Sequence, residues 1–206
     1  IIVKVARSAV CGTDMHMFAA DSEHVPRLPD GSPIVPGHEP VGWVAHVGPA
    51  AGSRWKVGDR VLVVGIEGCG LCHWCRVGRS NACDDIASIQ ALGLHRHGAD
   101  ATHLSAVQSN LVRLPGDVSF DTAVVLACAG GTAYTLLQEV AAAAHESIAV
   151  VGLGPVGLSV VILAKAMGAD VIGVNIAKER LRHARELGAD AVVDSTSGDA
   201  VAAVRV

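Results

Sequence analysis

The pattern of apolar and polar residues divides the chain into two parts. Up to about residue 120, short apolar runs are separated by Gly, Pro and Asp; examples are "IIVKVARSAV", "VGWVAHVG", "DRVLVVG" and "NLVRLP". Runs of this length, bounded by such residues, are typical of β-strands. We therefore predict a β-rich, irregular domain over residues 1–120.

From about Asp121 the pattern changes to Ala-rich helical segments that alternate with apolar strands. "IAVVG" predicts a strand, residues 155–167 a helix, "DVIGVN" a second strand, "AKERLRHARELG" a second helix and "AVVD" a third strand. This β-α-β-α-β order is one half of a doubly wound parallel sheet, which usually has two halves. We expect an α/β fold in which residues 121–206 form the first half of such a sheet. We also expect a fragment truncated at both ends, so that any activity belongs to the parent protein.

Composition and charge exclude some classes of function. Residues 147–164 carry no charge and are long enough for a membrane span, but three glycines and Pro155 favour a strand, a turn and a helix. A net charge of −4 argues against a nucleic-acid partner. The first residues show no signal-peptide pattern. We expect a cytoplasmic protein that binds neither membrane nor nucleic acid.

Four of the six cysteines lie within "GCGLCHWCRVGRSNAC", residues 68–83. Their spacing is C-x2-C-x2-C-x7-C, with ligands Cys69, Cys72, Cys75 and Cys83. Four thiolates close a tetrahedral zinc shell and leave no open position, so this pattern predicts a structural zinc site. A disulfide pair and an iron-sulfur cluster are alternatives. The missing secretory signal disfavours the first, and the x7 spacing and following Asp84 disfavour the second.

A second set of candidate ligands is scattered along the chain. The stretches are "CGTDMH" with Cys11, "GHE" with His38 and Glu39, and "CAGGTAY" with Cys128. Two thiolates and an imidazole are three good zinc ligands, and three protein ligands leave the fourth position open. Taken singly, each residue also fits a buried free cysteine or a hydrogen-bonded histidine.

Together these stretches resemble the zinc-containing medium-chain alcohol dehydrogenases. "GHEPVGWVAHVGPAA" is similar to the family's zinc signature, the four-cysteine loop to its structural-zinc lobe, and the later glycine-rich stretch follows in the expected order. The resemblance implies a GroES-like domain followed by a Rossmann domain, and two zinc ions per chain. It implies a catalytic zinc held by Cys11, His38 and Cys128, with Glu39 as an occasional fourth ligand.

The resemblance also assigns roles around the catalytic zinc. Thr13 would take the proton of the alcohol and His16 would pass it toward solvent, while Asp14 would orient a zinc-bound imidazole. Thr13 also fits a turn hydroxyl, and His16 a solvated histidine. The histidines His95, His97 and His103 are expected to be solvated rather than to form a third metal site.

The stretch "VVGLGPVG" predicts the site of the hydride acceptor, NAD or NADP. In the G-x-G-x-x-G pattern Gly152 makes the tight turn, Gly154 lets the backbone approach the pyrophosphate and Gly157 permits close helix-strand packing. The negative phosphates are attracted by the following helix N-terminus. By resemblance, Val156 and Thr132 would pack beside the nicotinamide.

The second predicted strand ends at Asn175, where an NAD-specific site normally carries Asp or Glu. An amide does not repel the 2′-phosphate of NADP, and Lys178 and Arg180 follow within five residues. No Arg directly follows Asn175, so we expect weak cofactor selectivity with NAD slightly favoured.

The sequence therefore predicts a zinc-dependent NAD(P) oxidoreductase that interconverts an alcohol with an aldehyde or ketone. The substrate is expected in a cleft between the two domains, and the parent protein is expected to be a homo-oligomer, dimer or tetramer. An inactive structural or regulatory relative is one alternative, and a zinc-ribbon nucleic-acid binder is another. The joint presence of the candidate catalytic residues argues against the first, and the glycine-rich unit against the second.

Overall fold

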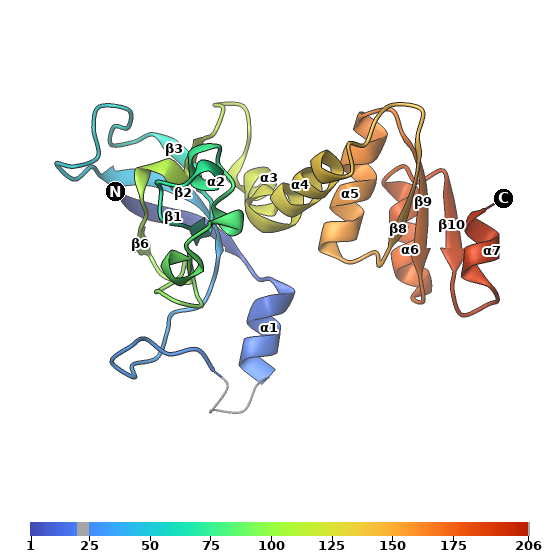
Figure 1. The fold of residues 1–206 in the computed structure, drawn as a ribbon, viewed down its shortest axis with the longest axis horizontal. Coiled ribbons are helices and arrows are strands. Elements are labelled where there is room, and N and C mark those ends of the chain that lie inside the picture. The colour runs from blue at the N-terminus through green and yellow to red at the C-terminus, as the bar shows by residue number, and fades with distance from the viewer. Residues whose placement is uncertain (20–24, 206) are drawn as a thin grey trace. The chain divides into compact units, whose positions relative to one another are not determined.

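The computed structural model describes residues 1–19 and 25–205. It divides into two compact units, Ile1–Cys128 and Ala129–Val206, which are described separately (Figure 1).

In the first unit, a sheet of antiparallel strands has the order β6-β1-β2-β3-β7 over the described residues. Its strands are β1 (Ile2–Ala9), β2 (Glu39–His46), β3 (Arg60–Val63), β6 (His103–Ser105) and β7 (Leu111–Arg113). A small antiparallel pair is formed by β4 (Ile66–Glu67) and β5 (Gln90–Ala91). The strands predicted from the four apolar runs are thus confirmed; they are β1, β2, β3 and β7.

Short helices connect these strands. They are α1 (Gly12–Ala19), α2 (His73–Arg76), α3 (Phe120–Val125) and the 3₁₀ turns η1 (Ser80–Ala82), η2 (Ile86–Ser88) and η3 (Gln108–Asn110). The helix α3 begins where the side chain of Ser119 accepts a hydrogen bond from Thr122 N, as a helix N-cap does. A π-helical turn, η4 (Leu126–Gly130), follows α3 directly.

The period of two along the strands divides the apolar side chains between two clusters. Val61 and Val63 of β3 pack in one cluster with Val3 and Val44, whereas Leu62 packs in the other with Val41. Adjacent side chains of a strand point to opposite faces, so both faces of this sheet are covered. The candidate ligands Cys11 and His38 lie next to the C-terminal end of β1 and the N-terminal end of β2.

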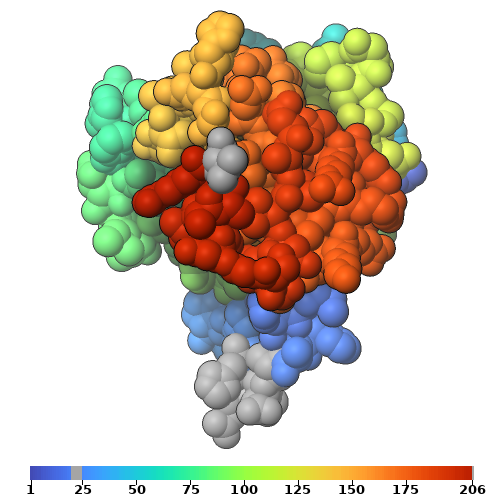
Figure 2. Space-filling view, turned by 90° about the vertical axis from the view of Figure 1, so that its right-hand side faces the viewer, coloured from blue at the N-terminus to red at the C-terminus, as the bar shows by residue number. Residues whose placement is uncertain are grey.

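The second unit contains a parallel sheet of order β10-β9-β8 in the described chain. Its elements are α4 (Gly131–Glu139), β8 (Ser147–Val151), α5 (Pro155–Ala166), β9 (Asp170–Asn175), α6 (Lys178–Glu186), β10 (Ala191–Asp194) and α7 (Ala200–Val204). The predicted β-α-β-α-β order is confirmed. Figure 2 shows the face of this unit on which the α7 segment, in red, lies at the surface.

The turn between β8 and α5 depends on two glycines. Gly152 has φ +91°, a conformation that residues with a side chain rarely adopt. A Cβ at Gly157 would collide with the carbonyl oxygen of Gly152, so the helix approaches the turn closely only because this side chain is absent. Pro155 occupies the first turn of α5, where its missing N–H costs no hydrogen bond. The predicted strand, tight turn and helix are all present.

The core of the second unit lies between the sheet and its helices. Val161 and Ala164 of α5 and Val171 of β9 are fully buried, and Leu181 of α6 packs in the same cluster. The uncharged stretch 147–164 forms a strand and a helix rather than one membrane-spanning helix. Among the described residues, the continuous helical run Phe120–Glu139 is long and apolar enough to cross a membrane by length and composition alone, which is weak evidence.

Candidate metal sites and nucleotide-binding turn

The four predicted thiols of the cysteine loop lie together. Their sulfur atoms are all within 4.8 Å of one another. The Sγ atoms of Cys69 and Cys75 are 4.0 Å apart, and those of Cys72 and Cys83 are 3.9 Å apart. A zinc ion with bonds of about 2.3 Å to four sulfurs would separate them by about 3.8 Å. The donor set and its spacing therefore fit a tetrahedral zinc site.

Backbone N–H groups point at these sulfurs. Cys83 Sγ accepts from the N–H of Cys69 at 3.3 Å, and Cys72 Sγ accepts from the N–H of Cys75 at 3.4 Å. The first contact, with the hydroxyl of Ser88, lowers the pKa of Cys83 to about 6. The second lowers the pKa of Cys72, whereas burial raises the pKa of Cys75 to about 11. Hydrogen bonds to the thiolate form favour the metal-binding state of the first two cysteines.

The scattered candidate ligands also meet in space. Each of Cys11, His38, Glu39 and Cys128 offers one ligand atom, and these atoms lie within 4.8 Å of one another. Cys11 follows the end of β1, and His38 and Glu39 stand at the start of β2, whose Glu39 pairs with Ala9 of β1. Cys128 lies in the π-helical turn η4. Such turns are rare and occur often at functional sites, because they displace a side chain from the regular helix.

Asp14 lies behind this cluster. Its Oδ2 accepts the N–H of Cys11 at 2.8 Å, and its Oδ1 is 3.4 Å from His38 Nδ1. The other ring nitrogen, His38 Nε2, is 4.0 Å from Glu39 Oε1 and so faces the cluster. Among the described residues, Asp14 Oδ1 and His38 Nδ1 are the buried side-chain atoms without a hydrogen-bond partner. A cation on Nε2 would fix the ring so that its Nδ1–H donates to Asp14, a common arrangement behind zinc-bound histidines.

The protonation of Cys128 also fits a cation site. Burial raises the pKa of its thiol to about 12, and the neighbouring Glu39 and Cys11 add to the rise. A negative charge on Cys128 is therefore unfavourable unless a positive charge lies nearby. A divalent cation would supply that charge and displace the protons.

Two further candidates, Thr13 and His16, lie on α1. Thr13 Oγ1 is 3.8 Å from Cys11 Sγ, and both Thr13 and His16 are exposed. Residues three apart on a helix share one face, so the hydroxyl and the imidazole lie on the same side of α1. Their roles in proton transfer stay a prediction.

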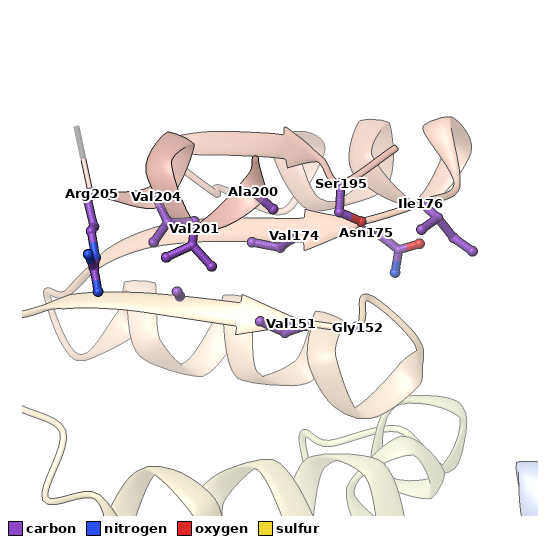
Figure 3. Close-up of a pocket in the computed structure, with 11 residues that line it drawn as sticks. Val151, Gly152, Val174, Asn175, Ile176, Ser195, Ala200, Val201, Val204 and Arg205 are labelled. Carbon is purple, nitrogen blue, oxygen red and sulfur yellow. The ribbon is translucent and has the colours of Figure 1, made fainter. Parts of the chain in front are cut away.

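In the second unit, the glycine turn borders a pocket of about 540 Å³ together with Asn175 (Figure 3). The pocket is otherwise largely apolar, and Val151, Val174 and Ile176 contribute to its walls. The two residues expected near a nicotinamide, Thr132 and Val156, lie in the first turns of α4 and α5. No hydrogen bond or other polar contact joins these two in the described structure, and their role stays a prediction.

Sequence reasoning overlooked some contacts. It treated Lys178 and Arg180 as equivalent, but Arg180 Nη1 would lie 4.0 Å from a Cβ at the turn glycine Gly154. It expected free, solvated histidines in the 95–103 segment. All three are exposed, as expected, but His95 Nδ1 also accepts the N–H of Ala91, and His97 Nδ1 accepts the N–H of Val35. Only the short sequence separation of His95 from Ala91 could have indicated one of these bonds.

Family models match both parts of the chain. Residues 1–116 match the alcohol dehydrogenase GroES-like domain, and residues 155–206 match the zinc-binding dehydrogenase model. The chain belongs to the zinc-type medium-chain alcohol dehydrogenase family. The predicted family and fold class are confirmed.

Curated relatives extend over nearly the whole chain. An alcohol dehydrogenase of Geobacillus stearothermophilus is 36% identical over 201 residues, which are 97% of this chain and 57% of the relative. An L-threonine 3-dehydrogenase of Rhizobium johnstonii is 34% identical over 95% of this chain and 55% of the relative. The chain thus spans little more than half the length of these relatives.

Solved structures also match nearly the whole of this chain and little more than half of their own length. Alcohol dehydrogenase TADH from Thermus sp. ATN1 has a TM-score of 0.87 and 31% identity, over 99% of this chain and 58% of that one. An alcohol dehydrogenase from Escherichia coli CFT073, described as short chain and complexed with NADH, has a TM-score of 0.86 and 27% identity over 100% and 58%. A protein from Sinorhizobium meliloti 1021 bound to NADP has a TM-score of 0.79 and 31% identity over 98% and 56%.

Proposed function

We propose that the whole protein carrying this chain is a zinc-dependent oxidoreductase that transfers a hydride between an alcohol and NAD(P), giving an aldehyde or ketone. The observation that carries the proposal is that ligand atoms of Cys11, His38, Glu39 and Cys128, from three distant segments of the chain, lie within 4.8 Å of one another, with Asp14 behind them. Relatives named alcohol dehydrogenase and L-threonine 3-dehydrogenase support the reaction class.

Cys11, His38 and Cys128 would hold the catalytic zinc, and Glu39 would occupy the fourth position when substrate does not. A bound zinc ion supplies Lewis-acid chemistry, which lowers the pKa of an alcohol as it does that of water. Asp14 would hold the His38 ring in place through Nδ1. The four-cysteine loop would hold a second, structural zinc.

Proton removal would follow α1. Thr13 would accept the proton of the alcohol and at the same time give up its own hydroxyl proton toward His16, which would pass a proton to solvent. The alcohol carbon would lose its hydride to the nicotinamide ring, so that the products are a carbonyl compound, NAD(P)H and one proton. The glycine turn Gly152–Gly154 would carry the pyrophosphate, and Val156 and Thr132 would flank the nicotinamide.

The remaining expectations for the whole protein are a cytoplasmic location and a homo-oligomeric state, dimer or tetramer. Free thiols at both metal clusters support a reducing compartment. We also expect residues 1–206 alone to show no turnover, since a doubly wound cofactor sheet needs its second half.

The test is Cys11→Ala in the whole protein. We expect it to remove one zinc per chain and alcohol-dependent reduction of NAD(P), while the second zinc and the melting temperature stay close to wild type. Zinc is measured by atomic absorption and turnover by absorbance of reduced nicotinamide over primary, secondary and polyol alcohols. Wild-type turnover in this variant would refute the mechanism, and an inactive wild type with both zincs bound would favour the non-catalytic alternative.

A further inference from the structure

The backbone that leads to the candidate ligand His38 lies against a segment some sixty residues further along the chain. Three backbone N–H groups of residues 98–100 donate to the carbonyl groups of residues 35–37. The bonds run from Gly98 to Val35 at 2.7 Å, from Ala99 to Gly37 at 2.8 Å and from Asp100 to Pro36 at 3.0 Å. The three residues before His38 are therefore all bonded to one short stretch of backbone.

Two glycines allow the two backbones to approach this closely. A Cβ at Gly98 would collide with the carbonyl oxygens of Pro36 and Gly37, which are backbone atoms and cannot turn aside. Gly37 has φ +92°, and a Cβ there would collide with the carboxylate of Asp100. Gly98 lies outside the positive-φ region, so a side chain at that position would act through its collision and not through backbone strain.

Other parts of the first unit anchor the stretch that contains Gly98. The guanidinium of Arg96 donates to the carboxylate of Glu67 in β4, and its Nη2 donates to Ser105 Oγ of β6 at 2.8 Å. Leu92, on the other side of Arg96, is 1% exposed and packs in the core cluster of the sheet. The stretch is thus held independently of residues 35–37 and can act as a support for them.

Asp100 also contacts the strand that leads to the second candidate ligand. Ser8 Oγ donates to Asp100 Oδ1 at 2.8 Å. Ser8 belongs to β1 and stands three residues before Cys11. The same oxygen, Oδ1, is the atom that lies against Gly37. One carboxylate oxygen therefore contacts both chain segments that lead to a candidate ligand.

We propose that Gly98 and Asp100 are positioning residues of the candidate catalytic zinc site. Gly98 fixes the backbone that carries His38, and Asp100 fixes that backbone relative to the segment before Cys11. The inference rests on the proposed function, because it concerns the zinc ion of that site. Zinc needs bonds of about 2.0–2.1 Å to nitrogen and about 2.3 Å to sulfur, so small movements of a ligand weaken its binding. Ligands whose backbone is already ordered before the metal binds give the higher affinity.

The first test measures the zinc affinity of Gly98→Ala in the whole protein, by competition with a chromophoric chelator. The zinc of the candidate catalytic site is identified as the one that Cys11→Ala lacks. We expect its dissociation constant to rise at least tenfold, the lower end of the effect of groups that orient metal ligands. The zinc of the four-cysteine loop should keep its affinity within twofold. Gly116→Ala is the matched control, because a Cβ there meets nothing within 4 Å.

The second test concerns the bond between Ser8 and Asp100, which is exposed and can be removed without opening the core. Ser8→Ala and Asp100→Ala should each raise the same dissociation constant about fivefold, within the range of a net hydrogen bond. The double variant should raise it no further, since both changes remove one bond. Asp100→Asn keeps an acceptor for the hydroxyl and should stay within twofold of wild type. Asp117→Ala, which removes an equal charge from an exposed turn, should have no effect.

Unchanged affinity in both Gly98→Ala and Asp100→Ala, or an equal loss at both zinc sites, would overturn the proposal while leaving the proposed function intact. Equal losses in Asp100→Asn and Asp100→Ala would show that charge matters and the bond does not, which overturns the role of Asp100. If Gly98→Ala does not fold, the Ser8 and Asp100 variants decide. If the wild type binds zinc only at the four-cysteine loop, the proposed function fails and the inference with it.

Discussion

At the residue scale, Asp14 shows how one buried side chain can organise a candidate metal site. One carboxylate oxygen accepts the N–H of Cys11 and the other faces His38, so the same residue positions candidate ligands from two distant parts of the chain. Motif resemblance indicated the role of Asp14 toward an imidazole. Its bond to the N–H of Cys11 could not be predicted, because it depends on how α1 begins after β1.

Thr13 carries the first residue-scale prediction. Replacing Thr13 with Ala should lower kcat about 100-fold, the lower range of a general acid-base contribution, because the alcohol proton loses its acceptor. Thr13→Ser keeps a hydroxyl and should retain most of the wild-type kcat. Both variants should keep the wild-type zinc content, since Thr13 is not a ligand. If Ala and Ser substitutions reduce kcat equally, the hydroxyl has no role in proton transfer.

At the element scale, periodicity predicted the strands and helices well, because each element buries one apolar face or stripe. The strand, turn and helix at 147–166 are an example. Gly152, Pro155 and Gly157 indicate a turn within a stretch that its apolar character alone would predict as one continuous element. The π-helical turn around Cys128 had no such signal. A π-helical turn depends on tertiary packing rather than on local propensity. The assignment of Cys128 as a candidate ligand therefore followed only from the family resemblance.

The cysteine loop provides the prediction at this scale. A Cβ at Gly68 would lie 2.6 Å from Cys75 Sγ and 3.2 Å from Cys83 Sγ. Sulfurs fixed by a metal cannot move aside, so Gly68→Ala should lose one zinc per chain. Overpacking costs about 1–3 kcal/mol, and we expect the melting temperature to fall by several degrees, at roughly 2–4 °C per kcal/mol for a chain of this size.

Gly116→Ala is the control for this variant, because a Cβ at Gly116 meets nothing within 4 Å. It should keep both zinc ions and the wild-type melting temperature. The same unchanged values in Gly68→Ala would show that the four sulfurs are not fixed by a metal, and the structural-zinc assignment would be wrong.

At the scale of the whole molecule, the two metal clusters belong to one compact unit and the glycine turn to the other. The sequence places different motifs in its strand-rich and helix-rich segments, with the boundary expected near residue 120, whereas the first compact unit runs to Cys128. The sequence could not predict that the Arg180 side chain lies near the glycine turn, because a charged residue in "AKERLRHARELG" is most simply a solvated one. Only its proximity to Gly154 in the folded unit separates it from Lys178.

Removal of metal from the whole protein should distinguish the two proposed zinc sites. The proposed structural site would have four thiolate ligands and no open position. The proposed catalytic site would have three protein ligands of mixed type and an open position that a chelator can enter. A bidentate chelator such as 1,10-phenanthroline should therefore remove one zinc first, with loss of turnover and little change in melting temperature. The second zinc should leave only at higher chelator concentration, together with a fall in melting temperature. If turnover survives the loss of the first zinc, the labile ion is not the catalytic one.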